Sequence, residues 1–332
     1  MFANVVDMSM KLDSFFRDAG LFIFRLVLGF LFVMHGWQNA VTKGWGSTRD
    51  SFAAMNIPAT DVAATLASWG ELVTGVLLIL GFLTRLSSFV LLIDMVGAFW
   101  FAHKDAGLWS SDGGYEYVLI LGACALLLLL TGAGAVSIDK LLFGRKKSST
   151  VGPTHSEITQ PREGLEPTLP KMGSLLPRCA NPLFSGSGSS SGTVVFMNKP
   201  EVRDAALLLL RIVVGLIFIA HGWDKAMMTG LSVTGGQFDQ LGIPQPELIA
   251  ALVSFVEMIG GAMIFVGILA PAASVVLIMD MVGALCFVHL HRGFFVANDG
   301  VEFVALLIVT LIVIAIFGAG RASLDYFFQR RS

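Results

Sequence analysis

The chain has 332 residues, of which 55% are hydrophobic and 14% are charged, and its mean hydropathy is +0.76. Soluble domains carry about 25% charged residues, so this composition excludes an ordinary water-soluble protein and favours one whose solvent is lipid. The net charge of −2 favours neither nucleic acid nor a polybasic lipid-binding surface. The cysteines Cys124, Cys179 and Cys286 share no motif, so neither a catalytic dithiol nor a cysteine metal site is expected.

The N-terminal residues 1–20 combine charged and aromatic side chains, which predicts a short segment lying at the membrane surface. The apolar run that follows is too long for a signal peptide, so we expect it to be retained as a membrane helix. Three more apolar runs follow, each with about the twenty residues that a bilayer core requires. The expected helices cover residues 21–41, 60–81, 86–102 and 115–135.

The second half of the chain repeats the first half at an offset of 186 residues. The thirteen residues from Arg25 to Trp37 and those from Arg211 to Trp223 are identical at seven positions. The offset holds without a gap as far as Asp139 and Asp325, which indicates an internal duplication. We therefore expect two repeats, 21–139 and 201–328, joined over 140–200 by a Ser-, Gly- and Pro-rich cytoplasmic linker that is disordered.

Lysine and arginine concentrate at both termini, in the linker and in the tight turn between the second and third helices. The positive-inside rule places these segments in the cytoplasm of a bacterial inner-membrane protein. Because each repeat has four helices, both repeats point the same way, and a pseudo-twofold axis along the membrane normal should relate them. The expected fold is an all-α integral membrane protein with two parallel four-helix transmembrane bundles and eight spans.

Both repeats carry ionisable side chains at membrane depth, where each requires a partner or a function. We expect the polar residues of the first three helices and the start of the fourth to line a pocket. This set is Arg25, His35, Trp37, Glu71, Asp94, His103 and Glu116, with the counterparts Arg211, His221, Trp223, Glu257, Asp280, His289 and Glu302. His103 lies nine residues beyond Asp94 and faces the same way only if the helix ends before it.

The charges near mid-membrane do not balance within a repeat. Glu71 and Asp94 lie near the middle of the bilayer, within reach of Arg25. If one carboxylate pairs with the guanidinium, the other has no counter-charge, and burial then favours a protonated carboxyl that can exchange its proton. The predicted site therefore handles protons within each repeat.

Each signal also has a structural interpretation. Arg25 can snorkel to the inner headgroups, the carboxylates can bind neighbouring helices together, and His35-Gly36-Trp37 can form an interfacial belt. Glu116 and Glu302 stand at helix starts, where a carboxylate suits the helix dipole. The Gly-Ala-Gly sequences at 132–134 and 318–320 suit helix caps better than phosphate nests. The recurrence of all these features in both repeats favours a pocket.

These motifs resemble the DoxX family of four-helix membrane proteins. The matching pieces are Arg25 to Gly36 and Arg211 to Gly222, Asn56-Ile-Pro58 and Gly242-Ile-Pro244, Glu71 and Glu257, and the endings Gly132 to Asp139 and Gly318 to Asp325. Two features depart from the family. The lysine that usually follows His-Gly is present only as Lys225, with Asn39 in the first repeat, and the unit occurs twice, as a pseudo-dimer within one chain. The resemblance implies association with membrane oxidoreductase systems, including a thiosulfate:quinone oxidoreductase subunit.

Three functions fit this sequence. The first is a quinone-interacting subunit of, or accessory to, an inner-membrane oxidoreductase system, with no built-in cofactor and no metal. Its slot would use Phe32, Trp37, Phe99 and Phe101, with His35 and Arg25 as donors and Glu71 or Asp94 as proton carrier. The alternatives are a proton-coupled small-solute transporter and a non-catalytic membrane scaffold or assembly partner. Expected partners are the lipid bilayer and membrane or soluble oxidoreductase subunits.

Overall fold

The computed structural model of the protein describes residues 2–143 and 200–330. The predicted linker falls almost entirely on residues 144–199 and so lies outside the described residues. Within the described ranges, every regular element is helical. The helices follow the apolar runs of the sequence, and glycine in the left-handed conformation ends several of them, as at Gly81 and Gly267.

The first repeat contains long helices joined by short helical turns. Its elements are α1 (Phe2–Trp37), η1 (Gln38–Thr42), α2 (Trp45–Ala54), α3 (Thr60–Thr65), η2 (Leu66–Gly70), α4 (Glu71–Leu80), α5 (Thr84–Ala98), η3 (Phe99–His103), η4 (Ser110–Asp112), α6 (Glu116–Thr131) and α7 (Ile138–Phe143). The elements of the second are α9 (Pro200–Trp223), η5 (Asp224–Met228), α10 (Leu231–Gln240), α11 (Pro246–Val266), α12 (Ala270–Ala284), η6 (Leu285–His289), η7 (Val296–Asn298), α13 (Glu302–Phe317) and α14 (Leu324–Gln329).

Helix α1 runs unbroken from Phe2 to Trp37. Residues 2–20 are thus the beginning of the first long helix rather than the separate surface segment that the sequence predicted. The sequence offers no proline there to stop the helix. Phe15 and Phe16 on this part of the helix are exposed.

Among the described residues, six helical segments are long and apolar enough to cross a membrane. They are Ser14–Thr42, Thr60–Leu80, Thr84–His103, Glu201–Met228, Pro246–Val266 and Ala270–His289. The fourth helix of each repeat, α6 or α13, has only 16 residues. At 1.5 Å per residue it spans roughly 24 Å, less than the ~30 Å of a bilayer core. The all-α membrane fold is confirmed, whereas the count of eight spans stays a prediction.

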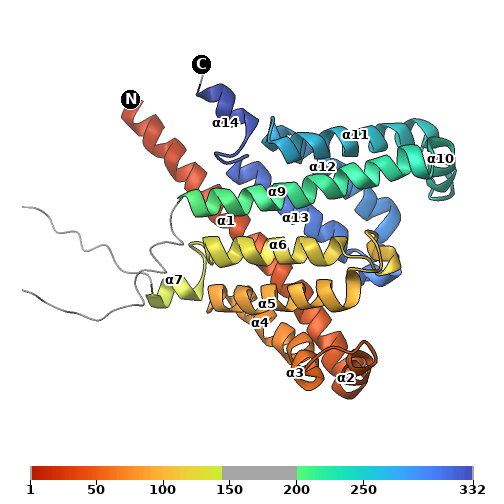
Figure 1. The fold of residues 1–332 in the computed structure, drawn as a ribbon. Coiled ribbons are helices and arrows are strands. Elements are labelled where there is room, and N and C mark those ends of the chain that lie inside the picture. Colours follow the sequence, from red (N-terminus) through yellow and green to blue (C-terminus); the bar gives the residue numbers. More distant parts are fainter. Residues whose placement is uncertain (1, 144–199, 331–332) are drawn as a thin grey trace, which may run out of the picture.

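The two repeats lie side by side and point in the same direction. Figure 1 shows α1 and α9 running the same way, with α7 and α14 at the end where both begin and the α2 and α10 hairpins at the other. Helix α6 packs against α9, and α13 packs against α1. Each repeat therefore places its fourth helix against the first helix of the other.

Helices α6 and α13 meet at the axis that relates the repeats. Cys124 Sγ and Thr310 Oγ1, at equivalent positions of the repeats, are 3.5 Å apart. The rings of Tyr117 and Phe303, also equivalent, have centroids 5.8 Å apart. Equivalent residues of two units related by a twofold axis meet only near that axis, so these contacts confirm the predicted parallel arrangement with its pseudo-twofold symmetry.

Glycines bring the first and second helices of each repeat into close contact. A Cβ built on Gly29 would lie 2.7 Å from the Gly75 carbonyl oxygen, and one on Gly36 would lie 2.4 Å from the Leu72 nitrogen. Gly215 and Gly261 repeat the first contact in the second repeat. This close packing holds the carboxylate helix, α4 or α11, directly against the histidine helix, α1 or α9.

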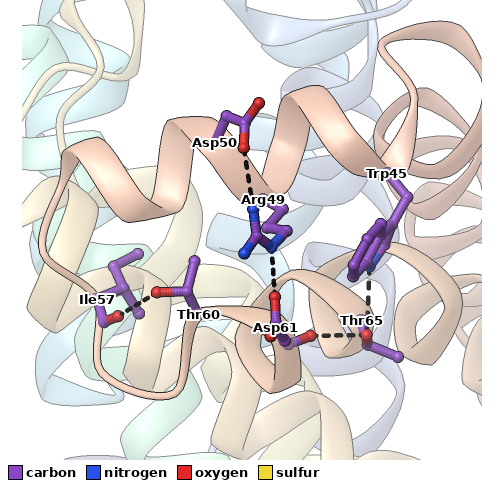
Figure 2. Close-up of polar contacts among 7 residues, drawn as sticks. All are labelled: Trp45, Arg49, Asp50, Ile57, Thr60, Asp61 and Thr65. Atoms are coloured by element: carbon purple, nitrogen blue, oxygen red, sulfur yellow. Dashed lines mark hydrogen bonds and ion pairs between the residues drawn. The ribbon is translucent and has the colours of Figure 1, made fainter.

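The repeats differ in the hairpin at the end away from the chain termini. In the first repeat, Arg49 binds Asp61 and lies 3.3 Å from Asp50, so the guanidinium connects α2 to α3 (Figure 2). Trp45 Nε1 donates to Thr65 Oγ1 at 3.2 Å, and Thr60 Oγ1 donates to the Ile57 carbonyl at 2.9 Å. The second repeat has Gly235 in place of Arg49, and a hollow of about 560 Å³ lies there between α10 and the start of α11.

Candidate functional site

Polar contacts between the end of the first helix of one repeat and the start of the fourth helix of the other join the two repeats. His35 Nε2 lies 2.8 Å from Glu302 Oε2, and His221 Nε2 lies 2.8 Å from Glu116 Oε2. Each histidine is near the end of the first helix of its repeat, and each glutamate begins the fourth helix of the other. These histidines and glutamates, which the sequence predicted to line a pocket within each repeat, therefore pair between the repeats.

Both glutamates of these pairs are also held by the loop that precedes their own helix. Glu116 Oε1 accepts hydrogen bonds from the backbone N–H and the hydroxyl of Ser110, at 2.8 and 2.7 Å. Glu302 Oε1 accepts from the Val296 N–H at 2.5 Å. The side chains of Glu116 and Glu302 are 1% and 0% exposed. The helix-start interpretation thus holds, but one carboxylate oxygen remains for the histidine of the other repeat.

Aromatic rings surround both histidines. The His35 ring lies 5.9 Å from that of Tyr117 and 5.5 Å from that of Phe295. The His221 ring lies 4.9 Å from that of Trp109 and 6.1 Å from that of Phe303. None of these four aromatic residues was predicted. Tyr117 and Phe303 directly follow the two helix-start glutamates. This position next to a predicted site residue is the sequence feature that could have indicated them.

A second polar layer lies deeper, on the second and third helices. Glu71 lies within electrostatic range of Asp94, and Tyr117 lies within electrostatic range of Glu302. Glu71 also lies within electrostatic range of Glu302. Glu71 Oε2 and the Tyr117 hydroxyl are buried without a hydrogen-bond partner. We define His35, Glu302, Tyr117, Glu71 and Asp94 as site one.

The equivalent cluster has different chemistry. Site two comprises His221, Glu116, Phe303, Glu257, Asp280 and Lys225. Lys225 Nζ donates to Glu257 Oε2 at 2.6 Å. Asp280 lies within electrostatic range of both partners, and its Oδ2 atom is buried without a hydrogen-bond partner. Phe303 replaces Tyr117, so site two has no hydroxyl between its histidine–glutamate pair and its deeper carboxyl groups.

The two buried arginines belong to neither site. Arg25 donates through Nη1 to the Ala133 carbonyl and through Nη2 to the Val136 carbonyl, the latter at 2.7 Å. Arg211 binds the Ala319 and Ala322 carbonyls in the same way. The predicted pairing of an arginine with a mid-membrane carboxylate is wrong, because the chain beyond the fourth helix presents carbonyls that lack helical donors.

Two further residues, Gly81 and Asp139, shape the surroundings of Arg25. Gly81 has a positive φ, and a Cβ there would lie 2.7 Å from Arg25 Cζ, so glycine leaves room for the guanidinium. Asp139 accepts hydrogen bonds from the Leu83 and Thr84 N–H groups at 2.7 and 2.9 Å, at the start of α5. The Gly-x-Gly to Asp ending therefore fastens the fourth helix to the first and third.

The third-helix histidines lie outside the two sites. Helix α5 ends at Ala98, before His103, and a π-helical turn follows. The helix thus ends where the sequence argument required it to end for His103 to face the same way as Asp94. Its Nδ1–H donates to the Gly113 carbonyl at 2.6 Å, and His289 makes the same contact with Asp299. Both histidines hold the loop before the fourth helix, and their predicted place in the pocket is corrected accordingly.

The predicted pocket tryptophans also lie elsewhere. Trp37 and Trp223 are 51% and 50% exposed. They follow the site histidines by two residues and so point away from them around the helix. Their exposure near helix ends fits the interfacial belt, and they do not line the site.

The fold and the two clusters define a multi-pass helical membrane protein with polar sites assembled between tandem repeats. The DoxX family model matches residues 20–104 and 206–290. The chain belongs to the DoxX family, with two copies of its unit.

The relatives are short membrane proteins. The Bacillus subtilis protein named "Putative oxidoreductase CatD" is 32% identical over 131 residues, which cover 40% of this chain and 91% of that protein. An uncharacterized membrane protein of Mycobacterium tuberculosis is 31% identical over 137 residues, 38% of this chain and 83% of that protein. The Escherichia coli inner membrane protein YqjF is 29% identical over 127 residues, 38% and 94% of the two chains. No solved structure matches the chain.

Proposed function

We propose that this protein is a quinone-interacting subunit of, or accessory to, an oxidoreductase system in the bacterial inner membrane, with both termini in the cytoplasm. The observation that carries the proposal is site one, where unpartnered buried polar atoms of Glu71 and Tyr117 lie beside the aromatic surroundings of His35. The names of the B. subtilis and E. coli relatives support an oxidoreductase link and an inner-membrane location.

Site one has the groups that a quinone headgroup requires. Tyr117, Phe295 and Phe303 supply apolar ring surface, and quinone sites are mostly apolar with few polar groups. The His35 imidazole and the Tyr117 hydroxyl are donors for quinone carbonyls. Glu71 and Asp94 hold protons at membrane depth. Reduction of a quinone to its quinol consumes two electrons and two protons; an electron-transfer partner supplies the electrons, and this site supplies protons.

Quinone binding by the purified full-length chain in lipid nanodiscs tests the proposal. A short-tail ubiquinone and a short-tail menaquinone are the probes, with equilibrium dialysis as readout. We expect saturable binding to the wild type and a loss of affinity of about fivefold in Y117F, because one hydrogen bond contributes about 1 kcal/mol. D105N, at an exposed position, is the matched control and should bind as wild type. Absence of saturable binding to the wild type overturns the proposal.

Proton-coupled transport of a small solute is the second candidate. It is favoured by the Glu71 and Asp94 pair, which has no direct ion pair with a cation in the described part of the chain. Proton-driven solute uptake by proteoliposomes, lost in E71Q, together with no quinone binding, would select this function instead.

A further inference from the structure

We propose that the two sites differ in proton capacity, site one holding one more exchangeable proton than site two. The residue pair that sets the difference is Asn39 in the first repeat and Lys225 in the second, which occupy equivalent positions. The inference holds whichever ligand the sites take, so it goes beyond the proposed function.

The side chains of this pair make different contacts. Lys225 Nζ donates to Glu257 Oε2 at 2.6 Å, and the glutamate side chain is 3% exposed. Asn39 Nδ2 donates instead to the Ala67 carbonyl at 3.1 Å. A buried lysine-carboxylate pair thus exists in site two, whereas the equivalent place in site one holds a neutral amide bound to backbone.

The remaining charged groups around the sites do not remove this difference. Lys43 lies within electrostatic range of Glu71, but it is exposed and its Nζ donates to Asn39 Oδ1 at 3.3 Å. Its equivalent in site two is Thr229. The Tyr117 hydroxyl is neutral, and Phe303 carries no polar atom. Arg25 and Arg211 bind carbonyls at the other end of the bundle.

Charge balance then gives the proton count. Isolated net charge is costly in a low-dielectric interior, so each site tends toward neutrality. Each has one imidazole and three carboxyl groups, and neutrality without another cation requires three protons on these four groups. Site one meets this condition only with three. In site two Lys225 carries one positive charge, so two protons are sufficient.

The surroundings of the deeper carboxyl groups agree with this difference. In site one, two buried polar atoms, the Tyr117 hydroxyl and Glu71 Oε2, lack a hydrogen-bond partner, whereas in site two one such atom, Asp280 Oδ2, lacks a partner. The π-helical turn η2 directly precedes Glu71, whereas α11 runs through the equivalent place as an unbroken α-helix. π-Helical turns within α-helices concentrate at functional positions. Site one accordingly holds the additional proton, whereas in site two Lys225 donates to Glu257 and supplies a positive charge.

Infrared spectroscopy of protonated carboxyl groups tests the inference on the full-length chain in lipid. E71Q, D94N and D280N assign and calibrate the carbonyl-stretch signals in H₂O and D₂O. The decisive variants are N39K and K225N, which exchange residues that the chain already uses at equivalent positions. We expect N39K to lose one protonated carboxyl signal assigned to Glu71 or Asp94, and K225N to gain one assigned to Glu257 or Asp280.

An unchanged number of signals in correctly folded N39K and K225N overturns the inference. Thermal unfolding reports on folding of both variants. If one variant does not fold, the other decides the question alone, since each predicts a change of opposite sign. The readout involves no quinone, so its failure is distinct from failure of quinone binding.

Discussion

Cys124 and Thr310 occupy equivalent positions in the two repeats and contact each other, with Sγ and Oγ1 3.5 Å apart. Both are fully buried. This contact locates the pseudo-twofold axis between α6 and α13, and it explains why the first helix of each repeat reaches the fourth helix of the other. The sites are consequently completed by the pairing of repeats, and an isolated first repeat would lack the Glu302 that pairs with His35 in site one.

The Cys124–Thr310 contact predicts a cross-link between the repeats. We expect T310C, in a chain with Cys179 and Cys286 changed to serine, to form a disulfide with Cys124 on mild oxidation, because the terminal atoms of the present pair already touch. A protease site placed between Phe143 and Pro200 provides the readout. After cleavage, the two halves should remain joined on a non-reducing gel and separate on a reducing gel. Separation under both conditions would contradict the axis.

The His35–Glu302 pair predicts energetic coupling across the repeats. H35A leaves Glu302 buried without its partner, and we expect a loss of about 3 kcal/mol in unfolding free energy, at the low end for buried pairs because the imidazole is 25% exposed. A double-mutant cycle should show coupling of His35 with Glu302 but additivity of His35 with Glu116. Coupling of His35 to Glu116 instead would mean that the pairs form within repeats.

Arg25 is expected to stabilise the fold without acting in site one. R25K retains the charge but cannot donate to the Ala133 and Val136 carbonyls as a planar fork does. We expect a loss of about 2 kcal/mol in stability, measured by denaturant unfolding in detergent. R211K should give a similar loss. Quinone affinity and the protonated carboxyl signals should remain at wild-type values in both, and a change in either would place an arginine in the site.

Gly36 is predicted to tolerate no side chain. A Cβ on Gly36 would lie 2.4 Å from the Leu72 nitrogen and 2.6 Å from the Ser68 oxygen, so G36A must push α4 away from α1. We expect destabilisation by about 2–3 kcal/mol. Gly97 is the matched control because a Cβ there meets no atom within 4 Å. G97A should be neutral or stabilising by up to about 1 kcal/mol through its helix propensity, as thermal unfolding would show.

Much of the fold could be predicted because its causes are local. Apolar runs of membrane length, glycine at helix ends and the constant offset between repeats are each visible along the chain. Small residues beside Glu71 pack closely, as Gly75 against Gly29 shows. By contrast, Gly97 beside Asp94 has open space around it, because the pattern of small residues does not say which neighbour fills a helix face.

The sequence by itself determined that this is a duplicated helical membrane protein with ionisable groups at membrane depth. Only the tertiary structure decided which of those groups meet. A duplicated sequence places the same glutamate in each repeat, so pairing of His35 with Glu116 and pairing with Glu302 look identical along the chain. The choice depends on how α6 and α13 cross at the axis, which is a property of packing between the repeats. In the same packing, Arg25 and Arg211 bind backbone carbonyls beyond the fourth helices instead of the carboxylates. It also brings Tyr117 into site one.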